Sequence, residues 1–224
     1  MWNNVFMKGK NDMKMKKIAV VIAASVLSLG LLSGCGSKPN TVKSADDLPG
    51  KTIGVQMGTT GDTYATELEE EPEEGKEPAK IEKYDSGADA VNALKQGKVD
   101  CVIIDNEPAK VFVSKNDDLQ ILPDPFADED YAVAVQKGNT ELVEKINGAL
   151  EELEKEGILK KIVDNYIGDD TKGSFKYESP ADVKRDNGTL VMATNANFPP
   201  YEMIENGRIV GIDPDIMQSV CDKL

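Results

Sequence analysis

The spacing of apolar residues changes several times along the chain. Stretches typical of strands are followed by stretches typical of helices. Short runs rich in β-branched and apolar residues predict strands at 51–57, 80–85, 99–105, 119–126, 131–137 and 188–194. Segments with apolar residues every three or four positions predict helices at 60–70, 86–98, 106–116, 139–157, 158–168 and 213–224. Alternating strands and helices indicate an α/β fold with a mostly parallel sheet.

The longest predicted helix shows the clearest pattern. Asn139 or Thr140 can cap its start, and Gly157 ends it. Its apolar stripe consists of Leu142, Ile146, Ala149, Leu150 and Leu153. The strand "VDCVIID" is almost wholly apolar, as strands buried on both faces of a parallel sheet are. Two polar stretches separate these elements, an acidic loop at 69–79 and a turn-rich segment at 169–187 that we interpret as a linker.

The first 34 residues have the pattern of an export signal. Three lysines at 14, 16 and 17 precede a 15-residue apolar run, "IAVVIAASVLSLGLL", which is shorter than the roughly 20 residues of a spanning helix. The run ends in Leu32-Ser33-Gly34-Cys35, which resembles a bacterial lipobox with cleavage before Cys35 and a lipid on its thiol. The alternative is a short membrane anchor followed by an accidental cysteine.

Charge excludes one class of partner. The first 34 residues hold five lysines and one aspartate, so residues 35–224 carry 21 basic and 39 acidic side chains and a net charge of −18. Such a surface repels nucleic acid and anionic lipid headgroups. We therefore expect no nucleic-acid partner.

The cysteines and the lack of histidine argue against metal chemistry and catalysis. Apart from Cys35 the chain has Cys101, in an apolar strand, and Cys221, on a predicted helix. Both are interpreted as small core residues, although a disulfide between them stays open. The chain has no histidine, the commonest general base and metal ligand. We expect no metal and no cofactor.

Three sets of residues lie where ligands bind in open α/β sheets, beyond the carboxyl ends of strands. The turn Gly58-Thr59-Thr60-Gly61 joins a strand to a helix, so its backbone N–H groups and the helix dipole can hold an anion. Asp105 ends a strand and can hold an ammonium group. Each has a plain structural alternative, a capped turn for the first set and a helix cap for Asp105.

The third set lies in "NANFPPYE". Phe198 and Tyr201 can wall a pocket for an apolar or cationic side chain, or can simply pack under the proline turn. Asn195 precedes them in the same bend.

Taken together, four segments resemble one family. "SADDLPGKTIGVQMGTTGD", "YDSGADAVNALKQGKVDCVIID", "YAVAVQKGNTELVEKINGALEELEKEG" and "TLVMATNANFPPYEMIENGRIVGIDPDI" are similar to the solute-binding proteins of polar amino-acid ABC importers, family 3 of the bacterial extracellular solute-binding proteins. The resemblance implies a type II periplasmic-binding-protein-like α/β fold, with two lobes of mostly parallel sheet that close over one amino acid. It also implies a two-strand hinge, with a crossing near Asp128 to Tyr131.

Carried over by position, the resemblance assigns a role to each candidate residue. Thr59, Thr60 and Gly61 would hold the ligand's α-carboxylate, and Asp105 its α-ammonium. Asn195, Phe198 and Tyr201 would line the side-chain pocket. A zwitterion needs one anion site and one cation site, so this assignment agrees with the chemistry of the residues themselves.

The order of the segments differs from the family. There, the segment corresponding to "TLVMATNANFPPYE" opens the protein, whereas here it follows the lobe that carries "GTTGD". The family's carboxylate-pairing arginine has no counterpart, because Arg185 and Arg208 lie in other contexts. We therefore expect a permuted chain with a truncated first lobe, or a fusion whose second binding domain is cut short.

The expected organisation follows from these assignments. A lipoprotein signal and a lipidated tether would precede a complete second lobe, the returning strand and helices of the first lobe, a linker, and the first lobe's opening strand and helix. The corresponding ranges are 1–34, 35–43, 44–130, 131–168, 169–187 and 188–224.

The leading hypothesis is a lipid-anchored protein at the outer face of the cell membrane, or in the periplasm, that delivers a polar amino acid to an ABC permease. A second hypothesis is a rearranged module of the same family without transport activity. A third is an enzyme on the same scaffold, with Glu202 or Asp105 as the acid, although the absence of histidine weakens it.

Overall fold

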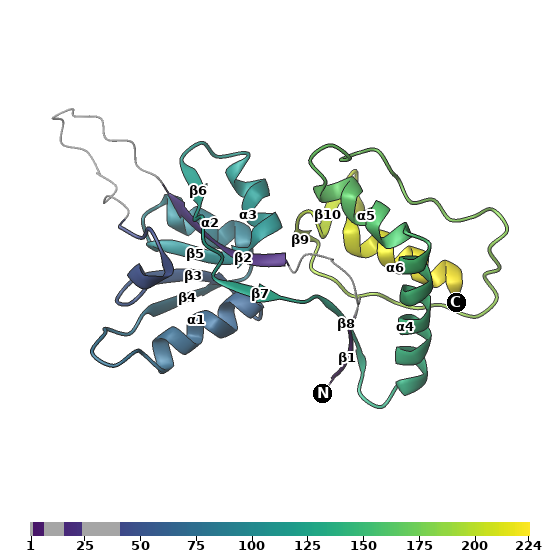
Figure 1. Ribbon diagram of the computed structural model, residues 1–224, viewed down its shortest axis with the longest axis horizontal. Coiled ribbons are helices and arrows are strands. Elements are labelled where there is room, and N and C mark those ends of the chain that lie inside the picture. Colours follow the sequence, from purple (N-terminus) through teal and green to yellow (C-terminus); the bar gives the residue numbers. More distant parts are fainter. Residues whose placement is uncertain (1, 7–15, 24–40) are drawn as a thin grey trace. The chain divides into compact units, whose positions relative to one another are not determined.

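The computed structural model describes residues 2–6, 16–23 and 41–224, with side chains from residue 41 onward. The chain divides into two compact units (Figure 1). Unit 2 comprises residues 16–129, and unit 1 comprises residues 130–224 together with the first strand, β1 (Trp2–Phe6).

Unit 2 is built on one mixed sheet in the order β4-β3-β5-β2-β6. Three of its strands run parallel: β4 (Lys80–Tyr84), β3 (Thr52–Gln56) and β5 (Cys101–Asp105). The strand β2 (Lys16–Ala23) is antiparallel to β5 on one side. On its other side β2 pairs with β6 (Leu119–Ile121) and β7 (Ala127–Glu129), both antiparallel.

Each parallel strand of unit 2 is followed by a helix, as the sequence pattern predicts. The helices are α1 (Thr60–Glu70), α2 (Gly87–Lys95) and α3 (Asn106–Val113), and a short 3-10 turn, Ala45–Asp47, precedes the sheet. Ala90, Val91 and Leu94 of α2 are buried, in agreement with the predicted helical face. All five residues of β5 are buried, so the interpretation of that strand as an interior strand is confirmed.

The strand β2 coincides with the start of the apolar run that the sequence analysis assigns to an export signal. Residues 24–40, which include the predicted lipidation site Cys35, lie outside the described residues. Among the helices that are described, none is both long and apolar enough to cross a membrane.

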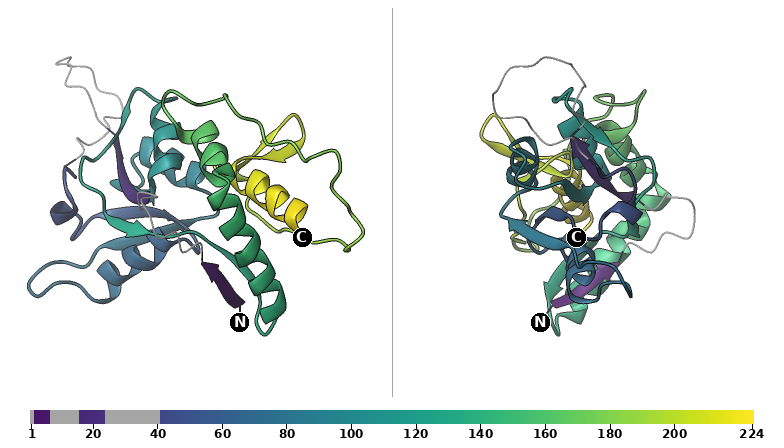
Figure 2. Two further views of the ribbon diagram at one scale, coloured as in Figure 1. Left: turned by 45° about the vertical axis from the view of Figure 1, so that its right-hand side comes forward. Right: turned by 90° about the vertical axis from the view of Figure 1, so that its left-hand side faces the viewer.

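The described part of unit 1 contains the helices α4 (Thr140–Lys155), α5 (Ile158–Ile167) and α6 (Ile212–Lys223). Helices α4 and α5, in green, both contact α6, in yellow (Figure 2). The strand β8 (Ala132–Gln136) pairs antiparallel with β1. The cap at Asn139 is confirmed, because its Oδ1 accepts the Leu142 N–H at 3.3 Å.

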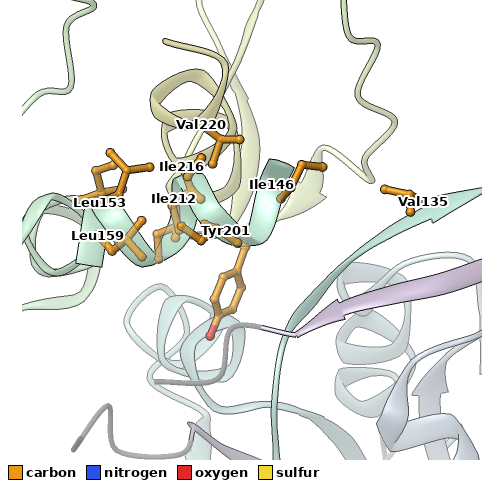
Figure 3. Packing of buried hydrophobic residues seen from close by; sticks show 11 residues of the cluster. Val135, Ile146, Leu153, Leu159, Tyr201, Ile212, Ile216 and Val220 are labelled. Carbon is orange, nitrogen blue, oxygen red and sulfur yellow. The ribbon is translucent and has the colours of Figure 1, made fainter. Parts of the chain in front are cut away.

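The core of unit 1 lies between these helices. It contains the predicted stripe residues Ile146, Ala149, Leu150 and Leu153, whereas Leu142 is only partly buried. Figure 3 shows Ile146 and Leu153 together with Leu159 of α5 and Ile212, Ile216 and Val220 of α6. Gly157, at φ 70°, ends α4 in the left-handed conformation that a residue with a Cβ adopts at a cost.

The predicted strand at 188–194 is wrong. No strand is assigned there, and Val191 is 92% exposed. A strand requires a neighbour to pair with, and the described strands of unit 1 pair with one another instead.

A small antiparallel sheet stands next in the sequence, and the sequence analysis missed most of it. Its strands are β9 (Asn197–Phe198), β10 (Glu202–Glu205) and β11 (Arg208–Val210). Asn206 and Gly207 form the turn between β10 and β11, both with positive φ. An Asn-Gly dipeptide between two short strands is the strongest short-range hairpin signal, so the sequence did indicate this hairpin.

The segment 169–187 has no helix or strand, in agreement with its polar composition. It is nevertheless attached to the helices by side-chain hydrogen bonds. Asn165 Oδ1 accepts the Phe175 N–H at 2.9 Å, and the buried Asp222 carboxylate accepts from the Tyr177 hydroxyl at 3.1 Å and from Arg185 at 2.9 Å. These hydrogen bonds attach the segment to helices α5 and α6 of unit 1.

Candidate functional site

The carboxyl ends of the three parallel strands of unit 2 form the candidate site. β3, β4 and β5 end at Gln56, Tyr84 and Asp105, and α1, α2 and α3 begin within four residues of these ends. Parallel strands end at the same edge of a sheet, so three helix N-termini meet there. Such an edge combines backbone N–H donors with positive dipole ends.

The turn after β3 is a capped helix start. Gly58 has a φ of +80°, and the Thr59 hydroxyl accepts the Asp62 N–H at 3.2 Å and donates to the Gln56 carbonyl at 2.9 Å. The structural alternative for this turn is therefore present. A capped start still leaves first-turn N–H groups without a partner in the helix, so an anion can bind there as well.

Gly61 brings this turn against the neighbouring strand. A Cβ on Gly61 would lie 3.2 Å from Ile103 Cγ2 and 3.3 Å from the Ile103 carbonyl oxygen. The absence of a side chain therefore allows the start of α1 to pack on β5, two residues before Asp105. Thr60, next to it, is exposed and Thr59 is half-buried.

The Asp62 side chain stabilises this turn through hydrogen bonds and an ion pair. Its carboxylate accepts the Gly58 N–H at 2.9 Å, pairs with Lys83 at 2.8 Å and accepts from the Thr66 hydroxyl at 3.2 Å. Burial by itself would raise the pKa of Asp62, but the hydrogen bonds and the charge of Lys83 outweigh it, so the pKa lies below its ordinary value.

Asp105 ends β5 and is 5% exposed. It occupies the N-cap position of α3, but its side chain makes no capping hydrogen bond. The capping role that the sequence allows is thus not the role of this carboxylate. A carboxylate at a strand's end can accept charge-assisted hydrogen bonds from an ammonium group.

Gln56 is a residue of this edge that the sequence analysis missed. It is 6% exposed, and its side-chain oxygen Oε1 accepts the Gly87 N–H at 2.9 Å. Gln56 thereby connects the end of β3 to the start of α2. The signal in the sequence was a polar residue at the end of an apolar strand, the position that Asp105 occupies in β5.

The three candidate residues of unit 1, Asn195, Phe198 and Tyr201, differ in burial. Tyr201 is 3% exposed and belongs to the core, where Figure 3 shows it beside Ile212. Phe198 is half-buried and stacks on Tyr201 with ring centroids 5.8 Å apart. The ring of Tyr131, a residue predicted at the hinge crossing and not in the site, has its centroid 4.7 Å from that of Tyr201.

Asn195 is exposed, and its carbonyl oxygen accepts the Asn197 N–H at 2.7 Å. The structure therefore groups Phe198, Tyr201 and Tyr131 in unit 1, and groups Gly61 with the strand of Asp105 in unit 2. Both Cys101 and Cys221 are free thiols. Burial raises the pKa of Cys101 to about 12, so it is an inert core residue.

The two arginines of the chain, Arg185 and Arg208, both lie in unit 1. Arg185 pairs with Asp222 at 2.9 Å, and Arg208 stands opposite Glu205 in the β10–β11 hairpin. Among residues 41–224, no group of three or more acidic, cysteine or histidine side chains is placed to hold a metal ion.

The candidate site thus consists of a capped helix start beside a strand that ends in a buried carboxylate. Residues 74–169 match the model of one family, the bacterial extracellular solute-binding proteins, family 3. The resemblance seen in the sequence is thus confirmed. The family is one of solute-binding proteins, not one of enzymes.

Individual relatives agree with the family match. The chain is 31% identical over 131 residues to the L-cystine-binding protein TcyJ of Escherichia coli (strain K12), a match that covers 58% of this chain and 47% of that protein. It is 35% identical over 127 residues to the arginine-binding extracellular protein ArtP of Bacillus subtilis (strain 168), covering 56% and 48%. The chain spans about half the length of the curated relatives it matches.

A solved structure supports the fold. An ancestral arginine-binding protein bound to glutamine is 33% identical, with a TM-score of 0.55, and the match covers 69% of this chain and 61% of that one. The fold is therefore that of the type II periplasmic binding proteins, as the sequence predicts. The matches do not test the individual site residues, which stay predictions.

Proposed function

We propose that the chain captures a polar amino acid outside the cytoplasm for an ABC importer, without chemical turnover. The observation that carries this proposal is the contact of Gly61 with Ile103, which joins an anion-binding helix start to the strand that ends in Asp105. An α-amino acid offers one carboxylate and one ammonium group to such an edge.

The roles follow from charge. The backbone of Thr59, Thr60 and Gly61 receives the α-carboxylate, because N–H groups at a helix start favour anions. Asp105 receives the α-ammonium through charge-assisted hydrogen bonds. Phe198 and Tyr201 form an aromatic wall for the ligand side chain, with Asn195 in the same bend, and an aromatic face suits a cationic or long polar side chain.

The proposed location rests on the leader. The leader consists of three lysines, a short apolar run and Leu-Ser-Gly-Cys. It directs export, and a lipid is attached to Cys35. The protein then stands at the outer face of the membrane or in the periplasm, where it delivers its ligand to permease subunits.

Thermal unfolding of the full chain in mild detergent tests the proposal against a panel of L-amino acids. A ligand present at 100 times its Kd adds about 2.7 kcal/mol to stability, which raises the unfolding temperature measurably. We expect a shift with one or a few polar amino acids and none with the corresponding amino-acid amide, which lacks the carboxylate, or the N-acetyl derivative, which lacks the ammonium.

Two variants separate binding from folding. Asp105→Asn should remove the shift, whereas Asp124→Asn, at an exposed position of the same unit, should keep it. A cooperative transition that no amino acid moves would contradict the proposal. It would favour a module without transport activity, a hypothesis supported by the engagement of Arg185 with Asp222.

A further inference from the structure

The strand β2 occupies an interior position in the sheet of unit 2. Val21 pairs with Val102 of β5 on one side and with Ile121 of β6 on the other. Ile18 likewise pairs with Asp105 of β5 and with Ala127 of β7. Backbone groups on both sides of β2 therefore take part in sheet pairing.

The neighbours of β2 depend on it. Among the strands described, β6 and β7 pair with β2 alone. The neighbour on the other side, β5, would lose the backbone partners that β2 provides at residues 102–105. Without β2, the sheet would end at β5 and two short strands would lose their partner.

The same residues belong to the predicted leader. Lys16–Ala23 includes the last two lysines before the apolar run and the first six residues of the run itself. A leader removed before Cys35 takes this strand with it. A segment cannot both leave with the leader and remain in the sheet of the processed chain.

We propose that unit 2 contains a strand-acceptor slot, bounded by β5 on one side and by β6 and β7 on the other, and that the leader segment Lys16–Ala23 is its occupant. Removal of the leader opens this slot to an antiparallel, apolar, extended strand supplied in trans. Binding by strand addition gains its affinity from main-chain hydrogen bonds. The occupant also bears on the candidate site, because Ile18 pairs with Asp105.

A cleavable form of the full chain tests this proposal. A protease recognition sequence is placed between residues 33 and 40, the purified protein is cut, and gel filtration in mild detergent shows whether the N-terminal piece stays with the remainder. We expect the piece to co-elute. We also expect amide hydrogen exchange of Val102 to Asp105 to stay slow after the cut.

Two proline variants identify the strand responsible, because proline removes a ladder donor and is excluded from interior strands. Val20→Pro, opposite Ile103, should speed exchange in β5 by at least tenfold. Val5→Pro, in the other strand of the same piece, pairs with Val133 in unit 1 and should leave exchange in β5 unchanged. Release of the unmodified piece, or exchange in β5 that stays equally slow in the cut Val20→Pro protein, would overturn the proposal.

A synthetic peptide distinguishes loss of the strand from a general folding defect of the Val20→Pro variant. A peptide of residues 14–25 should restore slow exchange in β5 of the cut Val20→Pro protein, and the same peptide carrying Val20→Pro should not. If neither peptide restores protection, the slot does not accept a strand in trans and the proposal fails. These measurements need no amino-acid ligand, so they are independent of the transport proposal.

Discussion

The side chain of Gln56 and the backbone of Gly87 are joined by a buried hydrogen bond, in which Oε1 accepts the Gly87 N–H at 2.9 Å. This bond connects the end of β3 to the start of α2 across the edge where the candidate site lies. It also satisfies a donor at the start of a helix, where no intrahelical partner exists.

Gln56→Ala should therefore destabilise unit 2. The Gly87 N–H would stay buried without its acceptor, at a cost of about 1–3 kcal/mol. Urea denaturation of the full chain measures the change. Gln120→Ala, at an exposed position of β6, is the matched control and should stay within about 0.5 kcal/mol of the parent. Equal effects of the two changes would show that the buried bond contributes nothing.

Asp62 should make stability depend on pH. Its pKa is lowered in the folded protein relative to the ordinary value of 3.8, so its contribution is present above that value and is lost as the pH falls through the folded pKa. The stability difference between the parent and Asp62→Asn should therefore be largest near neutral pH and should shrink below pH 3.8. Chemical denaturation at several pH values measures it, and a difference that grows on acidification would contradict the assignment.

Ile162 should be among the most sensitive core positions of unit 1. It is fully buried between the helices, and Ile→Ala in such a place costs about 2–5 kcal/mol through lost burial and a residual cavity. Ile204→Ala provides the comparison, because Ile204 of β10 is 63% exposed and should lose less than about 0.5 kcal/mol. Calorimetry of both variants tests whether unit 1 has the packed core described above.

Two glycine-to-alanine changes should have opposite signs. Gly148 lies inside α4, and a methyl group added there would meet no neighbouring atom within 4 Å, so Gly148→Ala should stabilise the helix by roughly 0.5–1 kcal/mol. Gly61→Ala places its methyl group 3.3 Å from the Ile103 carbonyl oxygen, so it should reduce the unfolding temperature and weaken any amino-acid-induced shift. If both variants gain stability, the close approach of α1 to β5 is not a constraint.

The sequence was sufficient for unit 2 wherever local pattern and burial coincide. The run "VDCVIID" is a wholly buried strand, and the helix after it begins where the proline in its first turn indicates. The turn at Gly58–Gly61 is a candidate because glycines and threonines at a strand-to-helix junction can hold an anion. Gln56 was missed because its structural role depends on a hydrogen bond with Gly87, 31 residues away. Hydrophobic periodicity does not predict such a long-range partner.

In unit 1 the sequence was less informative. The stretch at 188–194 has the composition of a strand, but a strand forms only with a partner, and partner availability is a property of the fold. At β2, residues of the predicted leader pair as an interior strand of the sheet. In both places the same residues are compatible with two environments, and tertiary pairing decides between them.

The exposure of Val191 has a consequence for the behaviour of concentrated solutions. The stretch Thr189 to Thr194 carries no charge and no proline, and it presents Val191 between Leu190 and Met192, which are both more than 40% exposed. Such six-residue stretches can stack between molecules into intermolecular β-structure. At neutral pH the net charge of −14 keeps molecules apart, but this repulsion vanishes near the isoelectric point of about 4.5. Colloidal stability is therefore lowest in mildly acidic solution, where light scattering should rise first.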